Sequence, residues 1–135
     1  MIYNIPMAII ISDIDDTILR YGKYPIKKTV DYLNAMAATH TIVLITGRSP
    51  SQEAQTRASL KNAGLKYNRL YMNGTQMGDN VFKGEKAKEL KAAGNTILVA
   101  IENNPAARAE YRKAGVATKH PDSLPSTAQK MTRYV

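Results

Sequence analysis

The chain has 135 residues, a length that suits one domain, and no apolar run approaches the roughly 20 residues that a membrane span needs. It contains no cysteine, which excludes disulfides and thiolate metal sites and favours a cytoplasmic location. Its 19 Lys and Arg against 11 Asp and Glu give a net charge of +8, which favours nucleic acids or phosphorylated substrates as partners and gives no reason to expect a membrane partner.

Along the chain, short β-branched apolar runs alternate with segments of helical periodicity. Glycines at 64, 94 and 115 are expected to end helices, and Asp79 is expected to cap the start of the third helix. The expected strands are residues 7–11, 41–45, 70–72, 96–101 and 116–118, and the expected helices are residues 26–38, 52–62, 79–93 and 105–114.

This alternation predicts an α/β fold, a three-layer Rossmann-like sandwich with a mainly parallel sheet of about five strands. No segment between the expected elements is long enough for a separate cap domain. We expect one domain over residues 1–118. Residues 119–135 contain two prolines and little periodicity, and they are expected to form a loosely packed basic tail.

Three carboxylates stand directly after the first strand, at Asp13, Asp15 and Asp16. Because like charges so close together repel one another, a bound cation is the simplest way to stabilise them. Parallel strands end at one edge of the sheet, so Thr46 and Glu102 are expected near the same cleft. This pattern indicates a metal-assisted reaction centre; the alternative is an acidic turn in which Asp16 caps a helix.

Four short motifs in this order resemble those of the haloacid dehalogenase-like hydrolases. Residues 13–17 match the pattern Asp-x-Asp-x-Thr, and residues 45–48 resemble the second motif, a strand ending in Ser or Thr. Lys83 near the start of the third helix resembles the third motif, with Lys86 as the alternative. Residues 102–103 stand where the acidic fourth motif belongs.

The resemblance implies phosphoryl transfer through an aspartyl-phosphate. It assigns Asp13 as the nucleophile and Asp15 as the acid and base, while Lys83 offsets the negative charge. It also implies a Mg²⁺ site formed by Asp13, the main-chain carbonyl of Asp15, Glu102 and Asn103. Because Asn103 stands where the family usually has an acidic residue, we expect a lower metal affinity.

The resemblance further assigns Thr46 to catalysis, as a donor to the phosphoryl group, and Thr17, Gly47, Arg48 and Lys23 to substrate binding. Lys23 lies between two tyrosines in a turn where the family places a small flap over the active site. On residue type alone, each has an alternative explanation: a threonine-glycine turn, a surface ion pair for Arg48, or ordinary turn packing around Lys23.

The short form, the basic charge and the run Leu70, Tyr71, Met72 before the lysine-bearing helix resemble the 3′-phosphatase domain of polynucleotide kinase/phosphatase. Asn104 stands where that subfamily commonly has an arginine. We therefore expect a Mg²⁺-dependent phosphomonoesterase that acts on a nucleotide or a nucleic-acid end. The alternatives are a phosphatase for a small metabolite and a phosphate- or nucleic-acid-binding protein with little catalysis.

Overall fold

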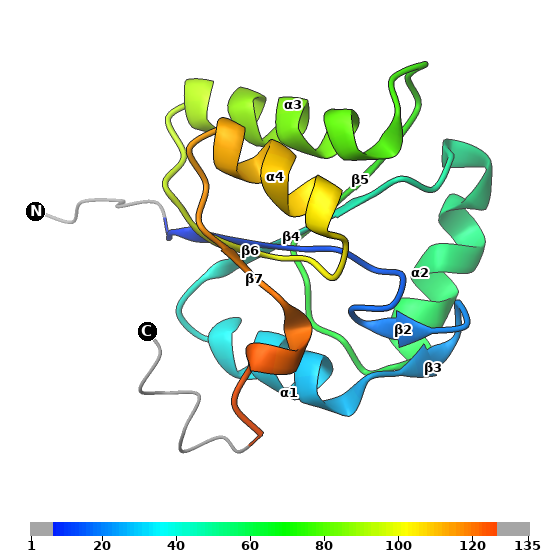
Figure 1. Ribbon diagram of the computed structural model, residues 1–135. Helices are drawn as coiled ribbons and strands as arrows, with labels where there is room; N and C mark the ends of the chain where they lie inside the picture. The colour runs from blue at the N-terminus through cyan, green and yellow to red at the C-terminus, as the bar shows by residue number, and fades with distance from the viewer. Residues whose placement is uncertain (1–6, 127–135) are drawn as a thin grey trace, which may run out of the picture.

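The computed structural model describes residues 7–126, and within this range a parallel sheet of five strands lies at the centre of the molecule (Figure 1). The strand order across the sheet is β5-β4-β1-β6-β7, so the first strand in sequence is the central one. The predicted α/β fold with a parallel sheet is therefore confirmed. The strands are β1 (Ile9–Ser12), β4 (Thr41–Thr46), β5 (Arg69–Met72), β6 (Ile97–Ile101) and β7 (Thr118–Lys119).

Helices cover both faces of this sheet (Figure 1). On one face, α1 (Lys27–Met36) and α2 (Glu53–Asn62) pack against side chains such as Ile10 of β1. On the other face, α3 (Asp79–Ala92) and α4 (Pro105–Lys113) pack against Ile9 and Ile11. Successive residues of β1 thus point to opposite layers, and all are buried because both layers are covered.

The close approach of α3 to α4 depends on Gly84. A Cβ at this position would lie 3.1 Å from the main-chain oxygen of Glu110 on α4. Because glycine has no Cβ, α3 and α4 can pack this closely. Lys83, the residue before Gly84, then reaches Asp13 at the end of β1.

A small antiparallel hairpin, β2 (Leu19–Arg20) and β3 (Tyr24–Pro25), follows β1, where the sequence predicted only a turn. The chain reaches this hairpin through Asp16, whose φ of 60° lies in the left-handed region that aspartate tolerates better than most residues. This conformation places the hairpin beside the end of β1 (Figure 1). Asp16 lies in a turn that leads into β2, and not at the start of a helix as the alternative from sequence had it.

Most element boundaries differ from the prediction by one or two residues, and the differences at α3 and β7 concern Asp79 and Val116. Gly78, and not Asp79, is the residue before the first turn of α3, because the carboxylate of Asp79 accepts a hydrogen bond from Asn73 Nδ2 instead of capping its own helix. The last strand lies at Thr118–Lys119, and Val116, expected within it, is instead a buried residue of the segment between α4 and β7.

The chain remains packed beyond Thr118. Leu124 is 3% exposed and belongs to the core beneath α1, and Lys28 Nζ donates to the main-chain oxygen of Asp122 at 2.6 Å. The later part of the predicted basic tail, residues 127–135, lies outside the described residues. In the part of the chain that the structure describes, no helix has the length and apolar character that crossing a membrane requires.

Candidate functional site

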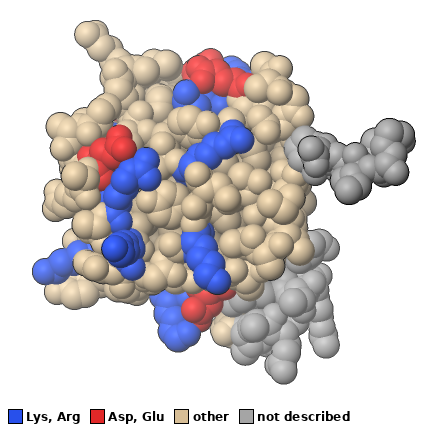
Figure 2. Space-filling model, turned by 180° about the vertical axis from the view of Figure 1, so that it is seen from behind, with Lys and Arg blue, Asp and Glu red and all other residues tan. Residues whose placement is uncertain are grey.

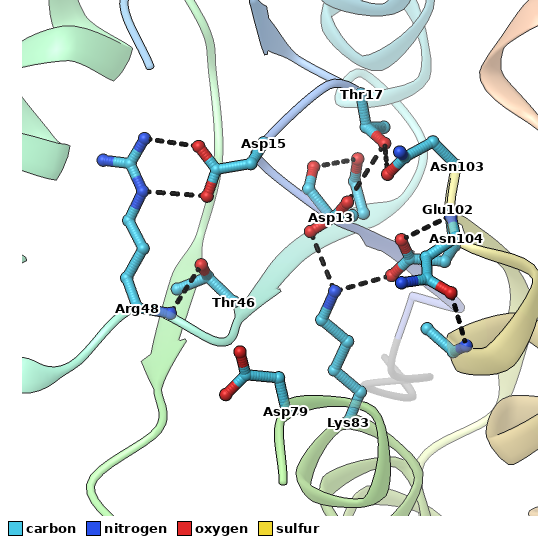
Figure 3. A network of polar contacts seen from close by, with 12 residues as sticks. Asp13, Asp15, Thr17, Thr46, Arg48, Asp79, Lys83, Glu102, Asn103 and Asn104 are labelled. Atoms are coloured by element: carbon cyan, nitrogen blue, oxygen red, sulfur yellow. Dashed lines mark hydrogen bonds and ion pairs between the residues drawn. The ribbon is translucent and has the colours of Figure 1, made fainter. Parts of the chain in front are cut away.

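A cleft of about 420 Å³ lies at the carboxyl ends of β1, β4 and β6, where the sheet topology brings three strand ends together. Most of the site residues predicted from the sequence line it, although they come from four separate stretches of the chain (Figure 3). These lining residues are Asp13, Asp15, Gly47, Arg48, Lys83, Glu102 and Asn103.

A buried ion-pair cluster of Asp13, Lys83 and Glu102 forms one wall of the cleft (Figure 3). Lys83 Nζ lies 2.9 Å from Asp13 Oδ1 and 2.8 Å from Glu102 Oε1. The three side chains are 7% exposed or less, so water screens their charges weakly. Two carboxylates face one ammonium, and the cluster therefore carries a net charge of −1 when all three groups are ionised.

This excess of negative charge affects the proton affinity of the cluster. Burial raises the pKa of Asp13 to about 7, and Glu102 adds to the rise while Lys83 opposes it. Burial by itself would lower the pKa of Lys83, but the two carboxylates outweigh it and raise that pKa. Lys83 therefore stays charged, and Asp13 is the group whose ionisation depends on what else enters the cleft.

Asn103 faces Asp13 from the loop after β6. As placed in Figure 3, its Oδ1 accepts a hydrogen bond of 3.2 Å from Thr17 Oγ1 but otherwise faces other acceptors. With the amide turned by 180°, Nδ2 would donate to Asp13 Oδ2 at 2.8 Å and to Asp15 O and Glu102 Oε2, each at 3.2 Å. In both orientations, oxygens of Asp13, Asp15 and Glu102 surround the same end of the Asn103 amide. A positive charge at this point would stabilise these oxygens.

The converging oxygens fit a small divalent cation. Carboxylate, carbonyl and amide oxygens are the ligand types that Mg²⁺ takes, and the Asn103 amide lies beside both Asp13 Oδ2 and Asp15 O. Among the described residues, no three carboxylate or histidine side chains gather as a metal site. A cation held here would therefore depend on a main-chain carbonyl and an amide as well as a carboxylate.

Glu102 is less available to a cation than the sequence suggested. Its Oε1 accepts from Lys83, and its Oε2 accepts from the main-chain N–H of Asn104 at 3.1 Å. Arg108 Nη1 donates to the main-chain oxygens of both Glu102 and Asn103, at 3.0 and 2.8 Å, and so fixes this loop. The side chain of Asn103, in contrast, lies beside both Asp13 Oδ2 and the carbonyl of Asp15.

Asp15 points away from Asp13 and forms a two-bond ion pair with Arg48 (Figure 3). Arg48 Nη2 lies 2.7 Å from Asp15 Oδ1, and Arg48 Nε lies 3.0 Å from Oδ2. Arg48 Nη1 also donates to Thr56 Oγ1 at 3.0 Å, which ties the guanidinium to α2. Both oxygens of Asp15 are therefore occupied by N–H donors.

Three predicted site residues do not line this cleft. Thr17 is fully buried, and its hydroxyl donates to Asp13 Oδ2 at 3.2 Å, so it contacts the aspartate and not the space in front of it. Thr46 is 1% exposed and its Oγ1 accepts from the main-chain N–H of Arg48 at 3.1 Å. Lys23 lines a neighbouring groove instead.

Residues that the sequence reading did not assign to the site also line the cleft. One sequence signal was available for Asp79, because it lies four residues before Lys83 and hence on the same face of a helix. Asp16 belongs to the carboxylate cluster after the first strand but was not assigned a role in the site, and no local pattern distinguishes the other two. These additional lining residues are Asp16, Gln52, Asp79 and Asn104. Lys86, the alternative to Lys83, pairs with Glu89 and lies over the ring of Tyr71.

The contact between Gly47 and Asp79 gives a first testable prediction. A Cβ on Gly47 would lie 2.3 Å from Asp79 Cγ and 2.7 Å from its Cβ, so Gly47→Ala should push the start of α3 away and destabilise the protein by roughly 1–3 kcal/mol. Chemical denaturation measures this loss. Adding Asp79→Gly should recover most of it, and a loss that persists in the double variant would contradict the proposed clash.

A model of the haloacid dehalogenase-like hydrolase family matches residues 10–126. A search of curated protein sequences found no match.

Solved structures show the same fold at low sequence identity. A chain of the Pnkp1/Rnl/Hen1 complex superposes with a TM-score of 0.73 at 18% identity, covering 85% of this chain and 45% of that one. A chain of the Pnkp1/Rnl/Hen1 RNA repair complex gives 0.64 at 18%, covering 84% and 42%. A HAD-superfamily hydrolase of subfamily IA, variant 1, from Geobacter sulfurreducens PCA gives 0.59 at 11%, covering 95% and 96%. The present chain thus spans less than half the length of the first two.

Proposed function

This chain belongs to the haloacid dehalogenase-like hydrolases, and we propose that it is a Mg²⁺-dependent phosphomonoesterase acting on a nucleotide or a nucleic-acid end. The observation that carries the proposal is the position of Asp13 at the end of β1. One of its oxygens is held by Lys83 and the other faces Thr17 and Asn103, in a cleft open to substrate. A carboxylate fixed in this way has the orientation that a nucleophile needs.

In the proposed reaction, a carboxylate oxygen of Asp13 attacks phosphorus. The bond between phosphorus and the ester oxygen breaks, and the leaving alcohol takes a proton from Asp15. Water then attacks the aspartyl-phosphate, gives its proton to Asp15, and releases inorganic phosphate while Asp13 recovers its carboxylate. Asp15 must first turn away from Arg48, because both of its oxygens accept guanidinium hydrogen bonds.

Asp13, the main-chain carbonyl of Asp15 and Asn103 would hold the cation, with Glu102 beside them. When bound, Mg²⁺ neutralises phosphoryl oxygens as negative charge develops. Lys83 adds a fixed positive charge on the other side of Asp13, at 2.9 Å. The main-chain N–H of Gly47, which lines the cleft, is the proposed neutral donor to the phosphoryl group.

The substrate class rests on charge and on structural likeness. The net charge of +8 favours an anionic substrate, and one similar fold belongs to a complex described as an RNA repair complex. On the face shown in Figure 2, the Lys and Arg side chains of the described residues stand in separate groups with uncharged surface between them. This distribution favours recognition of a substrate end in the cleft over an extended duplex bound across that face.

A substrate-panel assay tests the proposal. Phosphate release is measured from 3′-phosphorylated oligonucleotides, nucleotides and sugar phosphates, with and without Mg²⁺, and Asp13→Asn serves as the control. We expect Mg²⁺-dependent release that is fastest with nucleotide substrates and absent in the variant. Equal or faster turnover of sugar phosphates would support the small-metabolite phosphatase instead, and no turnover would support a binding protein with little catalysis.

Asn103 gives a prediction about the metal site alone. Asn103→Asp should bind Mg²⁺ about tenfold more tightly, since it adds a carboxylate beside Asp13 Oδ2 and Asp15 O. Without Mg²⁺ the same variant should melt at a lower temperature than the parent, because the new charge faces Asp13 and Glu102. Thermal melts across a Mg²⁺ titration measure both effects.

Asn104→Asp is the matched control for this experiment. It adds the same charge one residue along the loop, at a position whose Oδ1 accepts the main-chain N–H of Ala106 at 2.8 Å and where aspartate caps a helix equally well. Its Mg²⁺ dependence should equal that of the parent. An equal gain in Mg²⁺ affinity in both variants would show that general charge, and not ligation by residue 103, is responsible.

A further inference from the structure

We propose that a second groove, between the β2–β3 hairpin and α2, binds the nucleoside that carries the phosphate to be removed. The groove has a volume of about 550 Å³ and is called the hairpin groove here. The proposal rests on the proposed phosphatase function and specifies where the leaving alcohol lies. Its lining includes Tyr21, Lys23, Gln52, Gln55, Ser59 and Asn62.

The hairpin groove continues directly from the catalytic cleft. Asp15, Arg48 and Gln52 line both spaces, so the Asp15–Arg48 ion pair forms the boundary between them. A proton donor must lie within hydrogen-bond reach of the leaving oxygen. With phosphorus in front of Asp13 and the proton coming from Asp15, the leaving alcohol therefore passes on the side of Asp15, which is the side of the hairpin groove.

On the side of α2, the groove is lined by neutral polar side chains. Gln52, Gln55 and Asn62 are amides that offer both donors and acceptors, and Ser59 adds a hydroxyl. The charged side chains of the lining are Lys23 and the Asp15–Arg48 pair, and Arg48 keeps its bond to Thr56 when Asp15 turns away. The neutral donors and acceptors fit the edges of a nucleobase and the hydroxyls of a sugar.

Tyr21 supplies an aromatic surface at the mouth of the groove. Its side chain is 83% exposed, and its φ of 53° places a bulky residue in the left-handed region, which is costly for the backbone. The ring of Tyr24 meets it edge to face at a centroid distance of 6.5 Å, and Lys23 Nζ lies 5.1 Å from the centre of the Tyr24 ring. An exposed tyrosine held in this way fits a stacking partner for a nucleobase.

Binding measurements test the groove independently of turnover. In the Asp13→Asn background, where substrate is not consumed, calorimetry compares a nucleoside 3′-phosphate, a 3′-phosphorylated trinucleotide and ribose phosphate. We expect Tyr21→Ala and Gln55→Ala each to weaken binding of both nucleotide ligands about tenfold and to leave ribose phosphate unchanged. Tyr21→Phe should retain the affinity, and Lys88→Ala on the exposed face of α3 should change nothing.

The outcomes separate this inference from the proposed function. If Tyr21→Ala weakens all three ligands equally, or none of them, the hairpin groove does not bind the nucleoside, whatever the enzyme activity.

In steady-state assays the same variants should raise the KM for nucleotides about tenfold and leave kcat within about twofold. A fall in kcat for every substrate would assign Tyr21 to the hairpin structure. Tighter binding of the trinucleotide than of the mononucleotide would identify a nucleic-acid end.

Discussion

Asp13→Asn should make the metal-free protein more stable above pH 7 and should reduce Mg²⁺-dependent phosphate release by at least about 10³-fold. The loss of activity follows from the proposed role of Asp13 as the nucleophile. The gain in stability follows from the buried cluster, in which Asp13 and Glu102 share the single positive charge of Lys83. An asparagine at position 13 leaves Glu102 and Lys83 as a neutral pair.

The pH dependence of this gain has a defined sign. The pKa of Asp13 is raised from 3.8 to about 7 in the folded protein, chiefly by burial. Between these pH values the folded state binds a proton that the unfolded chain does not, and the associated stability is lost as the pH rises through 7. Asp13→Asn should therefore raise the free energy of unfolding by roughly 1–3 kcal/mol at pH 8 and by much less at pH 5.

Thermal and urea unfolding at the two pH values, in chelator, measure the effect. Asp122→Asn is the control, since it removes a carboxylate that is 93% exposed and should alter the stability little at either pH. Added Mg²⁺ should stabilise the parent protein but not Asp13→Asn, which has lost a ligand. A variant that is no more stable than the parent at pH 8 would contradict the excess negative charge in the cluster.

Lys83→Met should be among the most destabilising substitutions in the described part of the chain. It leaves two carboxylates buried without their ammonium, and breaking such a cluster costs about 3–5 kcal/mol. Methionine keeps the length and apolar stem of lysine, so the loss reports the charge and its hydrogen bonds. Phosphate release should also fall by a factor of about 10² or more, because the positive charge beside Asp13 is gone.

Lys88→Met is the matched control on the same helix. Lys88 is 52% exposed and pairs at the surface with Glu85, so its loss should cost no more than about 0.5 kcal/mol. Adding Glu102→Gln to Lys83→Met should recover part of the stability but none of the activity. Equal losses for Lys83→Met and Lys88→Met would show that the buried cluster contributes little to folding.

The fold was largely predictable from local patterns. Continuous β-branched runs at β1, β4 and β6 indicate strands covered on both faces, and the glycines at 64, 94 and 115 have positive φ at the ends of α2, α3 and α4. The β2–β3 hairpin was missed because its strands have two residues each, too few to show a period. Leu124 was missed for a similar reason, since burial of one residue in a segment with prolines has no periodic signal.

The sequence predicted which residues line the candidate site better than it predicted which of them form ion pairs and hydrogen bonds with one another. The positions of Asp13, Lys83, Glu102 and Asn103 at element ends bring them to one cleft, as expected for parallel strands. From sequence, an ion pair of Arg48 with a surface carboxylate was one of two alternatives, but Asp15 was not identified as its partner. It also favoured Glu102 as the acidic metal ligand, whereas both of its oxygens accept hydrogen bonds from Lys83 and Asn104.

By itself, the sequence determined the α/β order of elements and the carboxylates that follow β1, because hydrophobic period and residue type act over a few neighbouring positions. Only the tertiary structure decided which side chains meet. Lys83 reaches Asp13 across 70 residues, and Thr17 reaches Asn103 across 86. Those contacts depend on how helices pack on the sheet and how each loop leaves its strand. The same packing turns Asn103 toward Asp13, where its amide faces the oxygens proposed to hold the metal.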